Sequence, residues 1–259
     1  MTKRLCRQIG FGKPLLFWGF SLAFGLSRRT SMCSALSSHI LSLLYNQYYF
    51  IFAILPILLF FCGSVMEDDP IIFVLRYGSY KHYFTSKWRS LGVLCSGLWL
   101  GQITILFVTG AGLSVIKQGW DNFSGSSLLK EIAPLLVKSF PGAWVAVFCA
   151  AVYMLMGYWL IALLTLWLGH FLQRQKAIKV LLALYILTIL SIKLPIMSRP
   201  PFCYLTGINH WVLLLHNLTA GWRFPLTVIV TLLFVVTVIC SIQGGWRSCL
   251  LYTSPSPRD

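Results

Sequence analysis

The residues of this chain that could do chemistry are few, and they lie apart from its long apolar runs. Setting aside the last eleven residues, the acidic residues are Glu67, Asp68, Asp69, Asp121 and Glu131, and each is expected in a loop. A carboxylate within an apolar run would indicate an ion or proton pathway, because burying its charge in lipid is costly. The absence of one argues against a proton- or sodium-coupled carrier. The paired carboxylates or the Ser–His pair of an intramembrane protease are missing too.

Histidine and cysteine form no metal or redox motif in the sequence. His170 ends an apolar run and is expected at the membrane interface, whereas His210 and His216 fall in a loop without an acidic neighbour. The eight cysteines are scattered singly, so no CxxC pair occurs. No GxxxxGK(S/T) sequence is present, which excludes nucleotide binding through a P-loop. We expect no catalytic residue, no metal and no cofactor in this chain.

Composition indicates an all-α, polytopic integral membrane protein. Hydrophobic residues make up 58% of the chain and charged residues only 10%, whereas a soluble domain carries about a quarter charged residues. The net charge of +15 does not indicate nucleic acid as a partner. The basic residues flank apolar runs, where they set orientation and contact anionic lipid head groups.

Six apolar runs approach or exceed the length that crosses a bilayer. The predicted spans cover about residues 14–27, 48–65, 91–116, 143–172, 177–192 and 225–242. They form a single permease-like domain over residues 1–248. The first run is short, and a cleaved signal peptide is the alternative that would leave five spans.

Three local features qualify these spans. Pro56 is expected to kink the second one. Gly97 and Gly101 form a GxxxG pattern in the third, which permits close helix packing. The Pro- and aromatic-rich stretch from Leu194 to Arg223 contains the apolar piece WVLLLHNL, too short to span. A re-entrant or interface-lying helix before the sixth span fits it best.

The distribution of Lys and Arg predicts the orientation. With both termini on one side, that side holds twelve Lys and Arg residues and the other holds eight. The excess favours a cytoplasmic location for both termini.

The stretch from Met66 to Arg89 is too polar to sit in lipid and is expected to form an amphipathic elbow on the cytoplasmic surface. Asp69 followed by Pro70 is typical of a helix N-terminus, and Gly78-Ser79 is expected to break or bend that helix. An aromatic stripe recurs at helical spacing beside basic residues. The stripe is Tyr77, Tyr80 and Phe84, and the basic residues are Arg76, Lys81, Lys87 and Arg89. The alternative is a loop whose basic residues only fix topology.

This region resembles the second span and following loop of small bacterial ABC-type exporter permeases, especially those of Gram-positive bacteria. The resemblance rests on Asp69-Pro70, on the run Arg76-Tyr77-Gly78-Ser79 and on Ser86-Lys87, and it covers about forty residues. Tyr80 departs from the pattern, since a second basic residue is more usual there.

The resemblance implies a membrane subunit that couples ATP hydrolysis by a separate P-loop ATPase to export. It implies a coupling helix in the elbow, assembly with a second permease copy or homologue in the bacterial cytoplasmic membrane, and a lipid-like or peptide cargo. The implied ATPase-docking residues are Asp69, Pro70, Arg76, Tyr77, Gly78, Ser79, Lys81, Tyr83 and Lys87. Two alternatives stay open: a non-transport membrane protein of the immunity or stress type, and a secondary carrier.

The last eleven residues, Cys249 to Asp259, are set apart from this interpretation. The string CLLYTSPSPRD resembles the translation of a transposon-type sequencing adapter and has no relation to the apolar chain before it. We therefore expect a non-native, unpacked extension, with the native tail missing after about Ser248.

Overall fold

The structure is a computed structural model, and it describes residues 2–29, 35–66, 77, 79–114, 127–193, 208–214, 218 and 223–252. Over these residues it is helical, with one isolated bridge between Ala35 and Ser114 and no β-strand. The all-α prediction is confirmed. The helices are α1 (Thr2–Ile9), α2 (Gly12–Arg29), α3 (Leu36–Leu44), α4 (Gln47–Tyr49), the π-helical η1 (Phe50–Ile54), α5 (Leu55–Gly63), α7 (Tyr80–Thr109), α8 (Ser127–Ser139), α9 (Ala143–Phe171), α10 (Arg174–Lys193), α12 (Asn209–Val212) and α14 (Arg223–Tyr252).

Three described helices are long and apolar enough to cross a membrane: α7, α9 and residues Pro225–Ile242 of α14. The number rises to five if each of two bent helix pairs, α1 with α2 and α3 with α4–α5, counts as one span. These apolar helices fit a membrane protein, and among the described residues they amount to three to five candidate spans.

The sequence predicted spans at about residues 143–172 and 91–116, and the structure has a helix over each region. α9 covers Ala143–Phe171. α7 begins at Tyr80, before the predicted third span, and ends at Thr109. Ser79 caps α7 by accepting a hydrogen bond from the His82 backbone N–H at 3.3 Å. The polar residues after it therefore continue the same helix instead of forming a separate loop.

The predicted second span, about residues 48–65, falls on α4, η1 and α5, and a kink was expected in it at Pro56. A sharp bend lies just before this stretch, where α3 and the helix from Gln47 to Gly63 meet at 50° around Asn46. The Asn46 side chain accepts a hydrogen bond from the Tyr49 backbone N–H at 2.9 Å and so starts the second part. The π-helical turn η1 ends at Ile54, two residues before Pro56, which is where a proline lacking an N–H most needs a shifted hydrogen-bond pattern.

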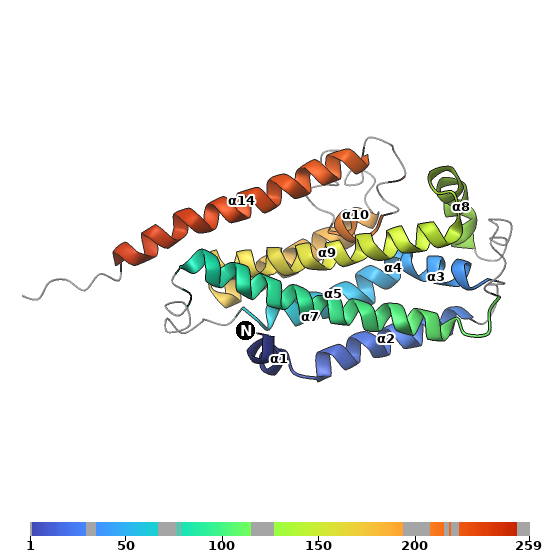
Figure 1. The fold of residues 1–259 in the computed structure, drawn as a ribbon, viewed down its shortest axis with the longest axis horizontal. Helices are drawn as coiled ribbons and strands as arrows, with labels where there is room; N and C mark the ends of the chain where they lie inside the picture. The colour runs from blue at the N-terminus through green and yellow to red at the C-terminus, as the bar shows by residue number, and fades with distance from the viewer. Residues whose placement is uncertain are drawn as a thin grey trace, which may run out of the picture.

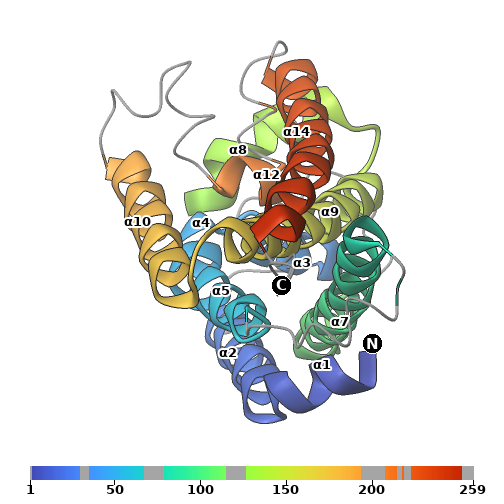
Figure 2. The ribbon, with the colours of Figure 1, turned by 90° about the vertical axis from the view of Figure 1, so that its left-hand side faces the viewer.

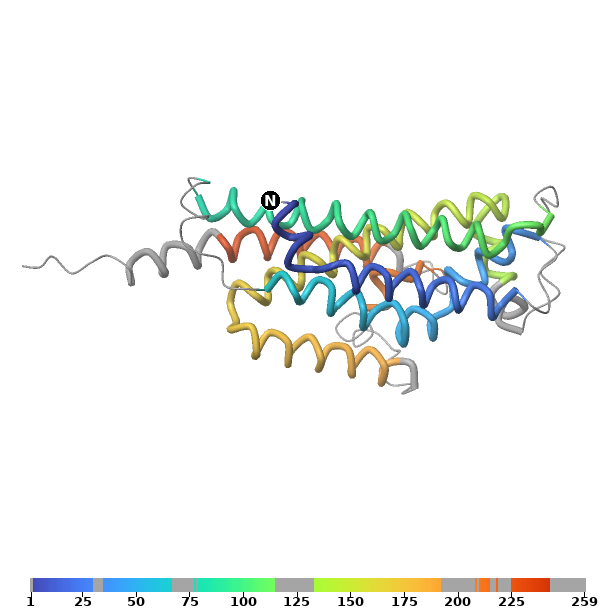
Figure 3. Tube along the Cα trace, turned by 90° about the horizontal axis from the view of Figure 1, so that it is seen from below, coloured from blue at the N-terminus to red at the C-terminus, as the bar shows by residue number. Residues whose placement is uncertain are grey.

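The helices form an elongated bundle with α9 at its centre (Figures 1 and 2). In the end view α2, α5 and α7 lie below α9, and α10 and α14 lie at the periphery. Burial agrees with this arrangement, since 56% of the most apolar 18-residue stretch of α9 is buried, against 17% of the corresponding stretch of α14. The tube in Figure 3 shows α7, α9 and the α2–α5 pair running side by side along the long axis. We therefore expect the buried functional side chains along α7 and α9.

Glycines let the central helices approach closely, but only half of the predicted GxxxG pair takes part. A Cβ at Gly101 would run into the Trp18 indole of α2, whereas one at Gly97 would meet nothing within 4 Å. Gly92 faces the Trp159 ring in the same way. Gly101 therefore belongs to the α2–α7 contact, and Gly97 makes no close helix contact among the described residues.

Candidate functional site

A chain of buried hydrogen bonds crosses the centre of the bundle. The Tyr158 hydroxyl of α9 donates to Gln102 Oε1 of α7 at 2.7 Å, and Gln102 Nε2 donates to the Tyr49 hydroxyl at 3.2 Å. Tyr49 then donates to Ser21 Oγ of α2 at 2.8 Å, and Ser21 donates to the Phe17 carbonyl. One continuous polar chain thus joins four helices, and we call it the Gln102 network.

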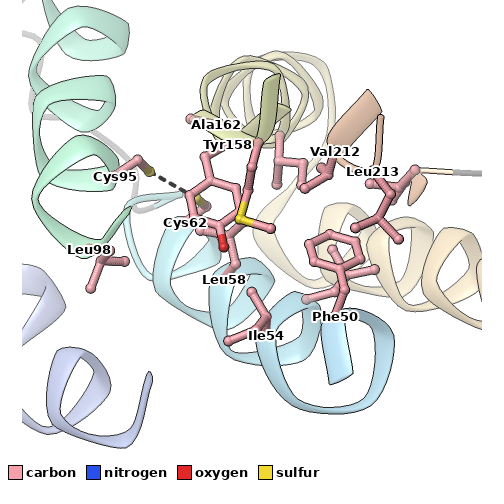
Figure 4. Close-up of a cluster of buried hydrophobic side chains, with 14 of the residues drawn as sticks. Phe50, Ile54, Leu58, Cys62, Cys95, Leu98, Tyr158, Ala162, Val212 and Leu213 are labelled. Carbon is pink, nitrogen blue, oxygen red and sulfur yellow. Dashed lines mark hydrogen bonds between the residues drawn. The ribbon is translucent and has the colours of Figure 1, made fainter. Parts of the chain in front are cut away.

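The Gln102 network is enclosed by apolar and aromatic side chains. The Phe24 ring stacks on Tyr49 with centroids 4.3 Å apart, and Phe17 meets Tyr158 edge-on at 6.2 Å. Gln102 and Tyr158 are both fully buried. Figure 4 shows Tyr158 among the apolar side chains of α5 and the short helix α12. In such surroundings an unmade hydrogen bond is costly, so the network favours one register of the four helices.

Tryptophan indoles add a second set of polar links along α7. Trp18 of α2 donates to the Leu98 carbonyl at 3.1 Å. Trp88 donates to the Trp159 carbonyl at 3.2 Å, and Trp99 donates to the Ala151 carbonyl at 2.9 Å. Each bond joins α7 to α2 or α9, which makes α7 and α9 a firmly connected pair.

The described part of the predicted elbow lies at the start of α7. Tyr83 is only 2% exposed, and it lies edge-on to Tyr77 at 5.5 Å and tilted to Tyr80 at 6.0 Å. The Lys87 ammonium lies 5.9 Å from the centre of the Tyr83 ring, and Lys87 is buried as well. The prediction that Tyr83 and Lys87 form a docking surface therefore needs correction, because both pack inward.

The outward face of the elbow consists of other side chains. Lys81, His82 and Arg89 are exposed, and Lys81 and Arg89 share one face because they are eight residues apart along a helix. Ser79 is half-buried at the cap. The docking residues Asp69, Pro70, Arg76 and Gly78 lie outside the described residues.

A short hydrogen bond connects the elbow to the far end of α9. The Tyr80 hydroxyl lies 2.6 Å from His170 Nδ1, with the two rings 4.6 Å apart. The sequence placed His170 at the interface and assigned it no partner, and it marked Tyr80 as the residue that departs from the permease pattern. The structure brings the two together, which ties the first turn of α7 to the last turn of α9.

A buried histidine lies at the opposite end of the bundle. His39 of α3 is fully buried, and its Nε2 lies 3.2 Å from Thr109 Oγ1 at the end of α7. Arg29 donates to the Ala111 carbonyl at 2.7 Å close by. Within the described residues no group of three His, Cys, Asp or Glu could hold a metal ion. We therefore interpret this site as a polar contact that joins α3 to α7.

The short helix α12 packs onto the midpoint of α9. Tyr153 donates to the His210 carbonyl at 2.6 Å, and a Cβ at Gly157 would run into Trp211 and Val212. Val212 and Leu213 are buried, and Val212 lies against Gly157. The described start of the apolar piece singled out in the sequence therefore reaches the middle of α9.

The Gln102 network was not predicted from the sequence. Its one sequence signal was a glutamine inside an apolar run, a residue type that seeks a partner across helices. Tyr49, Ser21 and Tyr158 carried no comparable signal. Comparisons of this chain with protein-family models, with curated proteins and with solved structures find no match.

Proposed function

We propose that this protein is the membrane-spanning permease subunit of an ATP-driven, ABC-type exporter in the bacterial cytoplasmic membrane. One observation carries the proposal: the elbow is joined to the central helices by Tyr80–His170 and by the indole bonds of Trp88 and Trp99. A coupling element must move with the spans that it drives, and these contacts supply that connection. The resemblance of residues Asp69-Pro70 to Lys87 to ABC-type exporter permeases implies that the partner is a P-loop ATPase.

The length of α7 would allow it to transmit a movement of the elbow to the central helices. A helix of 30 residues such as α7 is about 45 Å long, so one rigid element extends from the elbow through a whole bilayer. Displacement of its first turns would carry α9 along and shear the Gln102 network deeper in the bundle. Rigid-body motion of packed helices is a common way to convert docking into a change of access.

Six spans with cytoplasmic termini complete the proposal. The two bent pairs would each count as a span, and α10 with 20 residues is about 30 Å long, enough to cross the hydrocarbon core. The segment before the sixth span would be re-entrant instead of interface-lying, since α12 contacts Gly157 at the middle of α9. A second permease copy or homologue would complete the pathway.

The corrected docking surface consists of the exposed face of α7 together with the acidic-Pro step before it. Reversing two charges on that face, Lys81→Glu with Arg89→Glu, should weaken docking without disturbing the buried Tyr83 cluster. Loss of about 1.4 kcal/mol lowers the binding constant tenfold, which is within the range expected from altered charges across an interface.

The experiment is co-purification with the P-loop ATPase encoded beside this gene. Wild type should retain the ATPase, the Lys81→Glu/Arg89→Glu variant should recover about tenfold less, and a matched variant, Lys176→Glu/Lys179→Glu, should behave as wild type. Equal recovery by the first variant from equally folded samples would remove the coupling role. Failure of the wild type to retain any ATPase would favour the non-transport alternative.

A further inference from the structure

A groove opens on the side of the bundle between α5 and α10, near the start of α2. It has a volume of about 450 Å³. Its lining contains two basic side chains, Lys13 and Arg174, and is otherwise largely apolar. Phe60 is 64% exposed there and Leu182 is 55% exposed. Large apolar side chains that are exposed in this way indicate a surface that binds an apolar partner.

The length of the groove matches one leaflet of a bilayer. Along α10 it extends from Arg174 to Tyr185, and a rise of 1.5 Å per residue makes that about 16 Å. The hydrocarbon core of a bilayer is about 30 Å thick, so one leaflet is about 15 Å. The basic residues lie at the helix ends, and the apolar residues follow inward. An amphiphile with a head at the helix ends and a chain alongside α10 fits this order.

The basic side chains at the mouth of the groove indicate which lipid head group would bind there. Lys13 donates to the Ile9 carbonyl at 2.5 Å, and its ammonium lies 5.0 Å from the centre of the Phe60 ring. These contacts hold the cation at the mouth of the groove, above the apolar lining. Arg174 lies on the same lining, and a guanidinium presents paired donors that match a phosphate. Two cations at one mouth favour an anionic head group.

The surroundings strengthen the same preference. Arg7 on α1 lies at this end of the bundle and is exposed, and no described side chain is acidic. Basic pockets between membrane helices are recognised sites for anionic lipid head groups.

We propose that the α5–α10 groove is a binding site for an anionic phospholipid, with its phosphate between Lys13 and Arg174 and one acyl chain along Phe60, Leu182 and Tyr185. The site is independent of the proposed exporter function, because it requires only a chain embedded in a membrane. It gives the outlying helix α10 a lipid-mediated contact with α5, against which α10 packs only sparsely.

The experiment measures lipid binding to purified, delipidated protein in detergent by native mass spectrometry. The probes are dioleoyl phosphatidylglycerol, dioleoyl phosphatidylcholine and inorganic phosphate. Each basic residue near an anionic surface contributes about fivefold to binding, so Lys13→Gln/Arg174→Gln should lower phosphatidylglycerol affinity about 25-fold and leave phosphatidylcholine unchanged. The matched control Lys176→Gln/Lys179→Gln removes the same charge from the same end outside the groove and should keep the preference.

Two further variants separate the head site from the chain site. Lys13→Arg/Arg174→Lys keeps both charges and should keep phosphatidylglycerol binding, even if the glutamine variant is poorly folded. Leu182→Trp fills the groove at an exposed position and should lower the affinity of both lipids.

Four results would overturn the proposal. They are an unchanged preference in the glutamine variant, an equal loss in the Lys176/Lys179 control, full displacement of phosphatidylglycerol by inorganic phosphate, and a Leu182→Trp variant that binds both lipids normally but no longer self-associates. The last result would assign the groove to a second copy of the chain.

Discussion

Replacing Gln102 with leucine should destabilise the bundle by about 2 kcal/mol, although leucine suits an apolar helix better. The substitution removes the bonds from Tyr158 at 2.7 Å and to Tyr49 at 3.2 Å. Interhelical hydrogen bonds in membranes contribute about 0.6 kcal/mol on average and up to about 1.7 kcal/mol. The Tyr158 hydroxyl would also stay buried without its acceptor, a cost of about 1–3 kcal/mol. Tyr49 keeps its bond to Ser21, so its share is smaller.

Because Gln102 and Tyr158 share a hydrogen bond, the effects of their substitutions on the free energy of unfolding should not add. Tyr158→Phe alone should cost about 1 kcal/mol, because it breaks one bond and leaves the Gln102 oxygen buried. In the Gln102→Leu background the same change removes the stranded hydroxyl, so it should recover about 1 kcal/mol. The coupling energy from the double-mutant cycle should then be about 2 kcal/mol in magnitude. Thr104→Val is the matched control, since Thr104 is exposed two residues away and bonds only within α7.

The assay is equilibrium unfolding in mixed micelles by titration with sodium dodecyl sulfate, followed by far-ultraviolet circular dichroism and tryptophan fluorescence. The four proteins of the cycle and the Thr104→Val control are compared in one detergent background. Additive effects, within the roughly 0.3–0.5 kcal/mol expected of independent sites, would show that Gln102 and Tyr158 do not act as one unit. A large effect of Thr104→Val would mean that any polar change in α7 is disruptive.

Two further predictions test the packing around this network. Gly157→Leu should loosen α12 from α9, because its side chain would run into Trp211 and Val212; protease accessibility near α12 should rise, while the exposed neighbour change Met156→Leu should leave it unchanged. Cys62 and Cys95 lie with their sulfur atoms 4.0 Å apart, so in a variant that retains only these two cysteines, copper–phenanthroline should join α5 to α7. Fragments cut at a protease site inserted between them should then separate only after reduction, and separation without reductant would contradict the packing.

Local sequence properties were enough to determine the class of this protein and the identity of its long helices. A chain with 58% hydrophobic residues and continuous apolar runs near bilayer length favours helices, because an α-helix satisfies its backbone hydrogen bonds within the segment and needs about 20 residues to cross a bilayer. The bounds of α9 lie close to those predicted from the sequence, since Gly142 before it and the polar stretch after Phe171 mark its ends. The start of α7 was not predicted, because the Ser79 cap lies inside a segment that composition alone marks as polar.

The tertiary structure decided which residues meet. Gln102 lies 53 positions from Tyr49 and 56 from Tyr158, and Tyr80 lies 90 positions from His170. Periodicity reports which face of a helix is polar or apolar, but it carries no information about which helix that face will contact. Tyr83 illustrates the consequence: the family resemblance implied a place for it on the docking surface, and the packing of α7 turns it inward. Partner choice in a bundle depends on crossing geometry and on the few residues small enough to permit it, and both emerge only when all the helices are assembled.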